Sequence, residues 1–151
     1  MKQLASGISA PDFELPTING QSFRLSEATS GGQVALVFYK ASCPTCQFTF
    51  PYLQRIYEES RPRLIAVSQD DANETREFAD RFGITFDVVL DEHPYDVSTA
   101  YGVEFVPAVF MIGTDGIIQL SDYGFSKEAL SKIAGREVFR SDDGIPARRP
   151  G

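Results

Sequence analysis

The chain has 151 residues, of which 42% are hydrophobic and 23% are charged, so it can form one domain with a sizeable core. A formal net charge of −7 argues against nucleic acid or an anionic membrane surface as a partner, because both call for clustered Lys and Arg. No apolar run is long enough to span a membrane or serve as a signal peptide, which favours a cytoplasmic location for the chain as written. A periplasmic or other extracytoplasmic location stays open, because an exported protein without its signal or anchor would look the same.

The first part of the chain predicts a hairpin from 13 to 25, a strand from 34 to 39 and a helix from 44 to about 60. Asn19-Gly20 suits the two-residue turn of the hairpin. The strand is a continuous apolar run, as expected of a central strand covered on both faces. Apolar residues recur at three- and four-residue spacing in the helix, and Pro51 within it should produce a kink.

Strand and helix signals continue to alternate in the second part. The predicted elements are strands at 64–67, 86–90, 106–112 and 117–120, and helices at 71–82, 95–101 and 126–133. This order predicts an α/β fold with a mixed, mostly parallel central sheet flanked by helices on both faces. Residues 140–151 show no periodicity, so we expect a domain from 1 to 139 followed by a flexible tail from 140 to 151.

Cys43 and Cys46 are the only cysteines, and they lie where the apolar strand gives way to the helix. Two thiols at this spacing face each other across one helical turn, so they can form a small disulfide and open it again. A purely structural disulfide gains little from closing so short a loop. A zinc site needs four ligands, and beyond this pair the chain offers only His93, in a segment that we expect to be a solvated loop without a role. We therefore predict a redox-active pair that needs no metal and no cofactor other than its own disulfide.

The two thiols are expected to differ in their environment. Cys43 lies at the helix N-terminus, where the backbone amides carry partial positive charge and favour the thiolate, so it is the predicted nucleophile. Cys46 lies on the buried face and is predicted to resolve the mixed disulfide by attacking Cys43. Thr45 can offer a hydroxyl to the thiolate, and no cationic side chain lies between the cysteines, so an intermediate redox potential is expected.

Cys43-Pro44-Thr45-Cys46 after a buried strand, Pro51 in the helix and Val106-Pro107 before the late hairpin together resemble the thioredoxin fold. The N-terminal hairpin and the inserted helix and strand between 71 and 90 resemble the AhpC/TSA (redoxin) branch, which holds TlpA/ResA-like thiol-disulfide oxidoreductases and peroxiredoxins. The resemblance implies a monomeric enzyme that exchanges disulfides with protein partners and with an upstream thiol reductant or oxidant.

The resemblance also implies a substrate groove beside Cys43. Pro107 should be cis and should place the Val106 backbone where an extended substrate segment can pair with it as an added strand. The groove is then expected to be lined by residues next to the cysteines and before the proline. These residues are Ser42, Pro44, Thr45 and Val106, together with Phe105, Tyr39 and Ala41.

Three positions depart from the pattern of the family. Ser42 replaces the Trp that commonly precedes the first cysteine, which reduces the hydrophobic docking surface. Val37 and Thr49 stand where relatives place an acid or Asn, so no obvious buried acid accepts the proton of Cys46. Water or a group such as Lys40 would have to take that proton.

Two alternative functions follow from the same fold. A peroxiredoxin needs Pro-x-x-x-Thr-x-x before its peroxidatic cysteine, but Leu36 and Lys40 occupy those positions before Cys43. A client-binding or maturation module would use the groove without turnover. Replacing both cysteines separates these cases, because client binding would survive the change and disulfide reduction would not.

Overall fold

The computed structural model describes residues 2–151 and is built around a five-stranded sheet in the order β5-β4-β3-β6-β7. β3, β4 and β5 run parallel to one another, whereas β6 is antiparallel to β3 and β7 is antiparallel to β6. The strands are β3 (Val34–Tyr39), β4 (Leu64–Ser68), β5 (Asp87–Leu90), β6 (Ala108–Ile112) and β7 (Ile118–Tyr123). The predicted mixed central sheet is confirmed.

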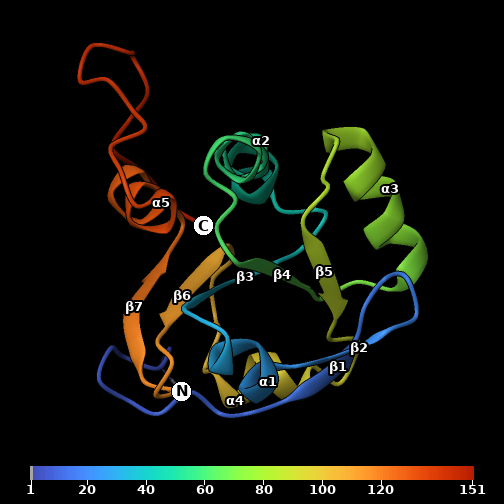
Figure 1. The fold of residues 1–151 in the computed structure, drawn as a ribbon. Helices are drawn as coiled ribbons and strands as arrows, with labels where there is room; N and C mark the ends of the chain where they lie inside the picture. The colour runs from blue at the N-terminus through green and yellow to red at the C-terminus, as the bar shows by residue number, and fades with distance from the viewer. Residues whose placement is uncertain (1) are drawn as a thin grey trace.

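Helices cover both faces of the sheet, as Figure 1 shows. The helices on one face are α2 (Pro44–Ser60), α3 (Ala72–Phe82) and α5 (Lys127–Ala134), and those on the other are α1 (Leu25–Ser30) and α4 (Asp96–Ala100). Side chains alternate along β3, so Tyr39 packs into the α2 side of the core and Phe38 into the α4 side. Every residue of β3 is therefore buried, which explains its uninterrupted apolar sequence.

The N-terminal hairpin consists of β1 (Glu14–Pro16) and β2 (Ser22–Arg24). Its turn is longer than the predicted two residues, because the Thr17 amide donates to the Gln21 carbonyl and leaves three residues between them. Gly20 is the last of these and has a φ of 83°, a conformation that glycine adopts without steric cost. Thr17 also bridges to Val89, so the hairpin rests against the edge strand β5.

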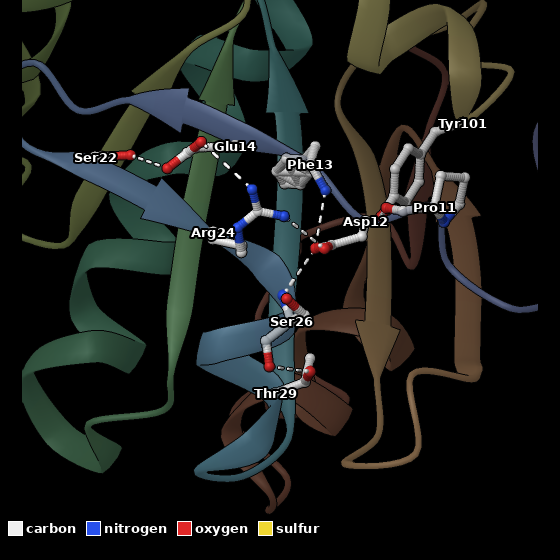
Figure 2. Close-up of polar contacts among 9 residues, drawn as sticks. All are labelled: Pro11, Asp12, Phe13, Glu14, Ser22, Arg24, Ser26, Thr29 and Tyr101. Atoms are coloured by element: carbon white, nitrogen blue, oxygen red, sulfur yellow. Dashed lines mark hydrogen bonds and ion pairs between the residues drawn. The ribbon is translucent and has the colours of Figure 1, made fainter.

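A cluster of polar contacts joins this hairpin to α1, as Figure 2 shows. The Asp12 carboxylate accepts hydrogen bonds from the amides of Phe13 and Ser26, both at 2.9 Å, and forms an ion pair with Arg24 at 3.0 Å. Burial by itself would raise the pKa of Asp12, but these hydrogen bonds lower it below its usual value. Beside the cluster, the buried Tyr101 hydroxyl donates to the Pro11 carbonyl at 2.6 Å.

The segment from Asp91 to α4 differs from the solvated loop that the sequence predicts. Asp91 is buried, and its carboxylate accepts hydrogen bonds from the Val97 amide at 3.2 Å and from the Ser98 amide and hydroxyl, both at 2.7 Å. It thereby satisfies amides at the start of α4 that have no partner within the helix. His93 itself is exposed, and the His93–Pro94 peptide bond is cis.

The final residues also differ from expectation, since the predicted flexible tail makes specific contacts. β9 (Arg148–Arg149) pairs antiparallel with β8 (Phe125–Ser126), just ahead of α5. Lys127 forms a largely buried ion pair with Asp143 at 2.7 Å. After α5 the chain forms a long loop and then returns, so that its C-terminal end lies between α5 and α2 in Figure 1. A two-residue strand has no periodicity, so its partner on β8 could not be recognised in the sequence.

None of the helices in residues 2–151 combines the length and apolar character needed to cross a lipid bilayer.

Candidate active site at the start of helix α2

The junction between β3 and α2 brings the two thiols together. Cys43 is the N-cap of α2, and its sulfur accepts a hydrogen bond from the Cys46 amide at 3.2 Å. Pro44 is the first helical residue, where its missing N–H costs nothing. Cys46 lies one turn along on the buried face and is fully inaccessible, whereas Cys43 is partly exposed. No disulfide joins the two sulfurs.

The surroundings of Cys43 favour its thiolate. A hydrogen bond from the Cys46 thiol is the largest cause, and it outweighs the opposing effect of burial. The amides of Cys46 and Thr45 and the positive charge of Arg149 act in the same direction, and together they lower the pKa of Cys43 to about 6. A large fraction of Cys43 is therefore ionised at neutral pH.

The environment of Cys46 has the opposite effect. Burial raises the pKa of its thiol, and the hydrogen bond to Cys43 and the charges of Cys43 and Asp70 raise it further. A hydrogen bond from the Lys40 backbone opposes this only in part. Cys46 thus stays protonated while Cys43 carries the negative charge, which fits one attacking sulfur and one waiting sulfur.

The loop before β6 closes one side of the site. The Val106–Pro107 bond is cis, as the resemblance implies, and the Cys43 thiol lies 3.4 Å from the Val106 carbonyl oxygen. Pro107 is buried, and its carbonyl accepts a hydrogen bond from Gly124 at 2.8 Å, which joins the loop to the end of β7. The backbone of Val106 therefore lies next to the reactive sulfur.

The other residues expected in the groove occupy three kinds of position. Ser42 and Pro44 are exposed beside Cys43, and Phe105 is 52% exposed and stacks on Tyr123 with ring centroids 5.4 Å apart. Thr45 is only 5% exposed, and its hydroxyl donates to the Pro150 carbonyl at 2.6 Å. The expectation that this hydroxyl serves the Cys43 thiolate is therefore wrong, and only the Thr45 backbone amide reaches that sulfur. The expectation that Tyr39 lines the groove is wrong, because its ring is buried in the core with its centroid 4.4 Å from that of Phe50.

The positions that depart from the family pattern hold no acid beside Cys46. Val37 is in the core, and the buried Thr49 hydroxyl donates to the Thr45 carbonyl at 2.7 Å. The Lys40 ammonium lies over the Tyr95 ring at 5.7 Å, so only the Lys40 backbone reaches Cys46.

Two charged residues near the thiols, Asp70 and Arg149, were not predicted from the sequence. Asp70 follows β4, and its carboxylate accepts a hydrogen bond from the Ala41 amide at 2.7 Å. The carboxyl ends of adjacent parallel strands meet at one edge of a sheet, so the place of Asp70 beside the Cys43 loop follows once β3 is known to pair with β4. Arg149 comes from the C-terminal segment, more than a hundred residues from the cysteines, and no sequence signal connects it to them.

The described residues, 2–151, contain no group of three or more His, Cys, Asp or Glu side chains arranged to hold a metal ion. The expectation that the pair needs no metal or other cofactor stays a prediction.

Comparison with known proteins supports the same chemistry. The AhpC/TSA family model matches residues 7–121. The thiol-disulfide oxidoreductase ResA of Geobacillus thermodenitrificans is 33% identical over 120 residues, which cover 77% of this chain and 68% of that protein.

Two solved structures are similar along most of their length. The one described as thiol:disulfide interchange protein DsbE from Chlorobium tepidum has a TM-score of 0.74 and 29% identity, covering 87% of this chain and 94% of the other. Peroxidoxin BcpB from Mycobacterium tuberculosis has a TM-score of 0.72 and 26% identity, with the same coverage of 87% and 94%. The chain therefore belongs to the AhpC/TSA family, in which it is a thioredoxin-fold thiol-disulfide oxidoreductase.

Proposed function

We propose that Cys43 and Cys46 pass two electrons to or from a partner protein through a mixed disulfide on Cys43. The Cys43 thiolate attacks one sulfur of the partner disulfide, the partner S–S bond breaks, and the second partner sulfur leaves as a thiolate that takes up a proton. Cys46 then loses its proton and attacks the Cys43 sulfur, which releases the first partner sulfur and forms the Cys43–Cys46 disulfide. The partner gains two electrons and two protons, and the reverse sequence oxidises a dithiol.

The observation that carries this proposal is the contrast between the two sulfurs. Cys43 is partly exposed with a pKa of about 6, whereas Cys46 is buried with a raised pKa, and the Cys46 amide lies 3.2 Å from the Cys43 sulfur. The first attack therefore falls to Cys43 and the resolving step to Cys46. The proton of Cys46 goes to water or to the departing partner thiolate.

The partner segment is proposed to bind in extended form along the Val106 backbone, as an added strand. Pro107 holds that backbone in place, with the exposed Ser42 and Pro44 and the Thr45 hydroxyl at the sides. Phe105 and Tyr123 supply an exposed aromatic surface near this position, where relatives would use the missing Trp.

The pKa of Cys43 also bears on the redox potential. A lower thiol pKa stabilises the reduced form, and about 6 lies between the values of about 7 for thioredoxin and about 3.5 for the strong oxidant DsbA. We therefore expect a midpoint potential between their values of about −270 and −120 mV. The proposal also includes a monomer and no cofactor beyond the disulfide. Its location is cytoplasmic for the chain as written, or periplasmic or otherwise extracytoplasmic if a signal or anchor has been removed. Light scattering, cell fractionation and elemental analysis test these three points.

Three proteins test the proposed roles: the wild type, Cys43→Ser and Cys46→Ser. The wild type should reduce insulin disulfides with dithiothreitol as electron source, and each variant should lose this turnover. Only Cys46→Ser should accumulate a mixed disulfide with the substrate, because only it keeps the attacking sulfur. A mixed disulfide on Cys46 in the Cys43→Ser variant would reverse the assigned roles.

Thiol peroxidase activity is a second candidate, favoured by the similarity to peroxidoxin BcpB and by the cationic Arg149 near Cys43. In that reaction the Cys43 thiolate attacks one oxygen of hydrogen peroxide, the O–O bond breaks, and the second oxygen leaves as hydroxide, which takes up a proton to become water. The Cys46 thiol then attacks the resulting sulfenic acid, which forms the Cys43–Cys46 disulfide and releases the sulfenic oxygen, with the Cys46 proton, as a second water. Stopped-flow measurement of peroxide reduction tests it. A second-order rate constant equal to that of free cysteine would eliminate it.

A further inference from the structure

The C-terminal segment returns across the molecule to the edge of the active site. The Lys127 amide donates to the Ala147 carbonyl at 2.9 Å, and β9 pairs with β8 in the next two residues. The Arg148 guanidinium binds the Asp122 carboxylate at 2.7 Å and donates to the Tyr123 carbonyl at 3.3 Å. Residues 147–149 are thus anchored along the end of β7 and the start of α5.

The residues after this anchor lie on the dithiol motif itself. Thr45 stands between the two cysteines in the sequence, and its hydroxyl donates a hydrogen bond to the Pro150 carbonyl at 2.6 Å. The Thr45 residue is only 5% exposed. Gly151 lies so close to Val106 that a side-chain carbon on it would overlap the Val106 carbonyl oxygen. That same oxygen lies 3.4 Å from the Cys43 sulfur.

Arg149 points its charge toward the same place. Its guanidinium lies over the ring of Phe48 in α2, 4.7 Å from the centroid. From there its positive charge acts on Cys43 and helps to lower the pKa of the thiol. The segment therefore contacts the site by main chain, by hydrogen bond and by charge.

These contacts use the atoms that a partner would need. Under the proposed function, an extended partner segment pairs with the Val106 backbone next to Cys43, and that backbone is already covered by Gly151. Two segments cannot occupy the same position. We propose, resting on that function, that residues 147–151 fill the substrate groove as an internal competitor, which a partner must displace before exchange.

The contacts of the segment also indicate which partners suit the groove. A cation fits over the Phe48 ring, from where its charge acts on Cys43, and a second cation fits against Asp122. Only a small residue fits over the Val106 carbonyl. The formal net charge of −7 of the whole chain favours the same sign of partner. The preferred substrates are proteins that present an extended segment with Arg or Lys next to the reactive sulfur.

Gly151→Val tests the competition, because the added side chain cannot fit against Val106 and should push the end of the segment out of the groove. Ser141→Val places the same side chain at an exposed position of the tail and serves as the control. Each protein is assayed with insulin and with hydroxyethyl disulfide, which is small enough to reach Cys43 beside the segment. Gly151→Val should raise the ratio of the insulin rate to the small-disulfide rate by about threefold or more. The reason is that the apparent affinity of the protein for insulin scales with the fraction of molecules in which residues 147–151 have left the groove. Ser141→Val should leave the ratio unchanged.

A synthetic peptide with the sequence Ile-Pro-Ala-Arg-Arg-Pro-Gly provides the second test. When added to the Gly151→Val protein, this peptide should slow the reduction of insulin. A peptide with Glu in place of both Arg residues should have no such effect. If the wild type reduces insulin but Gly151→Val leaves the rate ratio unchanged, or the basic peptide has no effect on this variant, the internal competitor is overturned. If the wild type reduces the small disulfide but no protein disulfide in any variant, the proposed function fails and the inference fails with it.

Hydrogen exchange keeps the proposal testable should Gly151→Val alter the fold. In Cys46→Ser, residues 147–151 should exchange faster when Cys43 carries a basic cysteine-containing peptide in a mixed disulfide than when it is free. Equal exchange in the two states would show that the segment and a partner coexist, which contradicts the competition.

Discussion

The sulfur of Cys43 accepts hydrogen bonds from both the backbone amide and the thiol of Cys46, the amide at 3.2 Å. One residue thus lowers the pKa of its neighbour through two groups, and only one of them depends on its side chain. The two contributions can therefore be separated by substitution at position 46.

Cys46→Ala should raise the pKa of Cys43 by about one unit or more, because the thiol hydrogen bond is the largest cause of the lowered value. Cys46→Ser is the matched control, since its hydroxyl can still donate, and it should keep the pKa closer to about 6. The rate of iodoacetamide alkylation as a function of pH measures both values. Identical titrations in the two variants would mean that the backbone amides and Arg149 account for the shift.

The stability of the reduced protein should depend on pH through the same thiol. The pKa of Cys43 is about 6 in the folded protein, whereas an ordinary cysteine, as in the unfolded chain, has a pKa of 9.0. Between these two pH values the unfolded chain binds more protons than the folded protein, so the free energy of unfolding rises with pH. This contribution is lost as the pH falls through 6. Above pH 9 the trend should reverse, because folded Cys46 keeps a proton that the unfolded chain releases.

Urea denaturation from pH 5 to 10 measures this dependence. The reduced wild type should show the rise and Cys43→Ser should not, and the oxidised protein, which has no thiol to titrate, serves as a second control. Parallel pH profiles for all three would contradict the assignment.

Phe50→Ala should destabilise the protein by about 3–5 kcal/mol, the usual cost of removing a fully buried aromatic ring. The ring lies against Tyr39, Phe78 and Phe86 with centroids 4.4, 5.2 and 6.0 Å away, so its loss leaves a cavity behind the dithiol helix. Phe105→Ala makes the same change at an exposed position and should cost less than about 1 kcal/mol. Chemical denaturation compares the two, and equal losses would show that Phe50 is not part of a tightly packed core.

Tyr101→Phe should cost about 0.5–2 kcal/mol, because it leaves the Pro11 carbonyl without the buried hydroxyl that donates to it at 2.6 Å. The ring contacts with Phe38 and Phe110 would remain, so the effect isolates the hydrogen bond. Tyr123→Phe, at a position 47% exposed, provides the control and should be nearly neutral. Thermal unfolding measures both, and hydrogen exchange around Pro11 should rise only in Tyr101→Phe.

Local sequence patterns determined much of the fold and the core of the site. The apolar run at 34–39 and the three- and four-residue spacing after Cys43 coincide with β3 and α2, because burial on two faces and on one helical face leave different periodicities. The Cys43-Pro44-Thr45-Cys46 spacing placed both thiols within one turn. Tyr39 was misassigned, since alternation along a strand does not reveal which face of the sheet lines a groove.

Only the tertiary structure decided the contacts between residues distant in the chain. Asp70 reaches the loop before Cys43 because β4 pairs with β3, and Arg149 reaches Cys43 because β9 pairs with β8. Asp91 is buried because α4 turns its first amides toward the carboxylate. Sequence alone thus determined which residues can carry the redox chemistry, since that depends on local spacing. The proposed groove and the segment 147–151 that is proposed to fill it depend on strand pairings between distant residues. A strand as short as β9 has no periodic pattern, so the sequence does not reveal its pairing with β8.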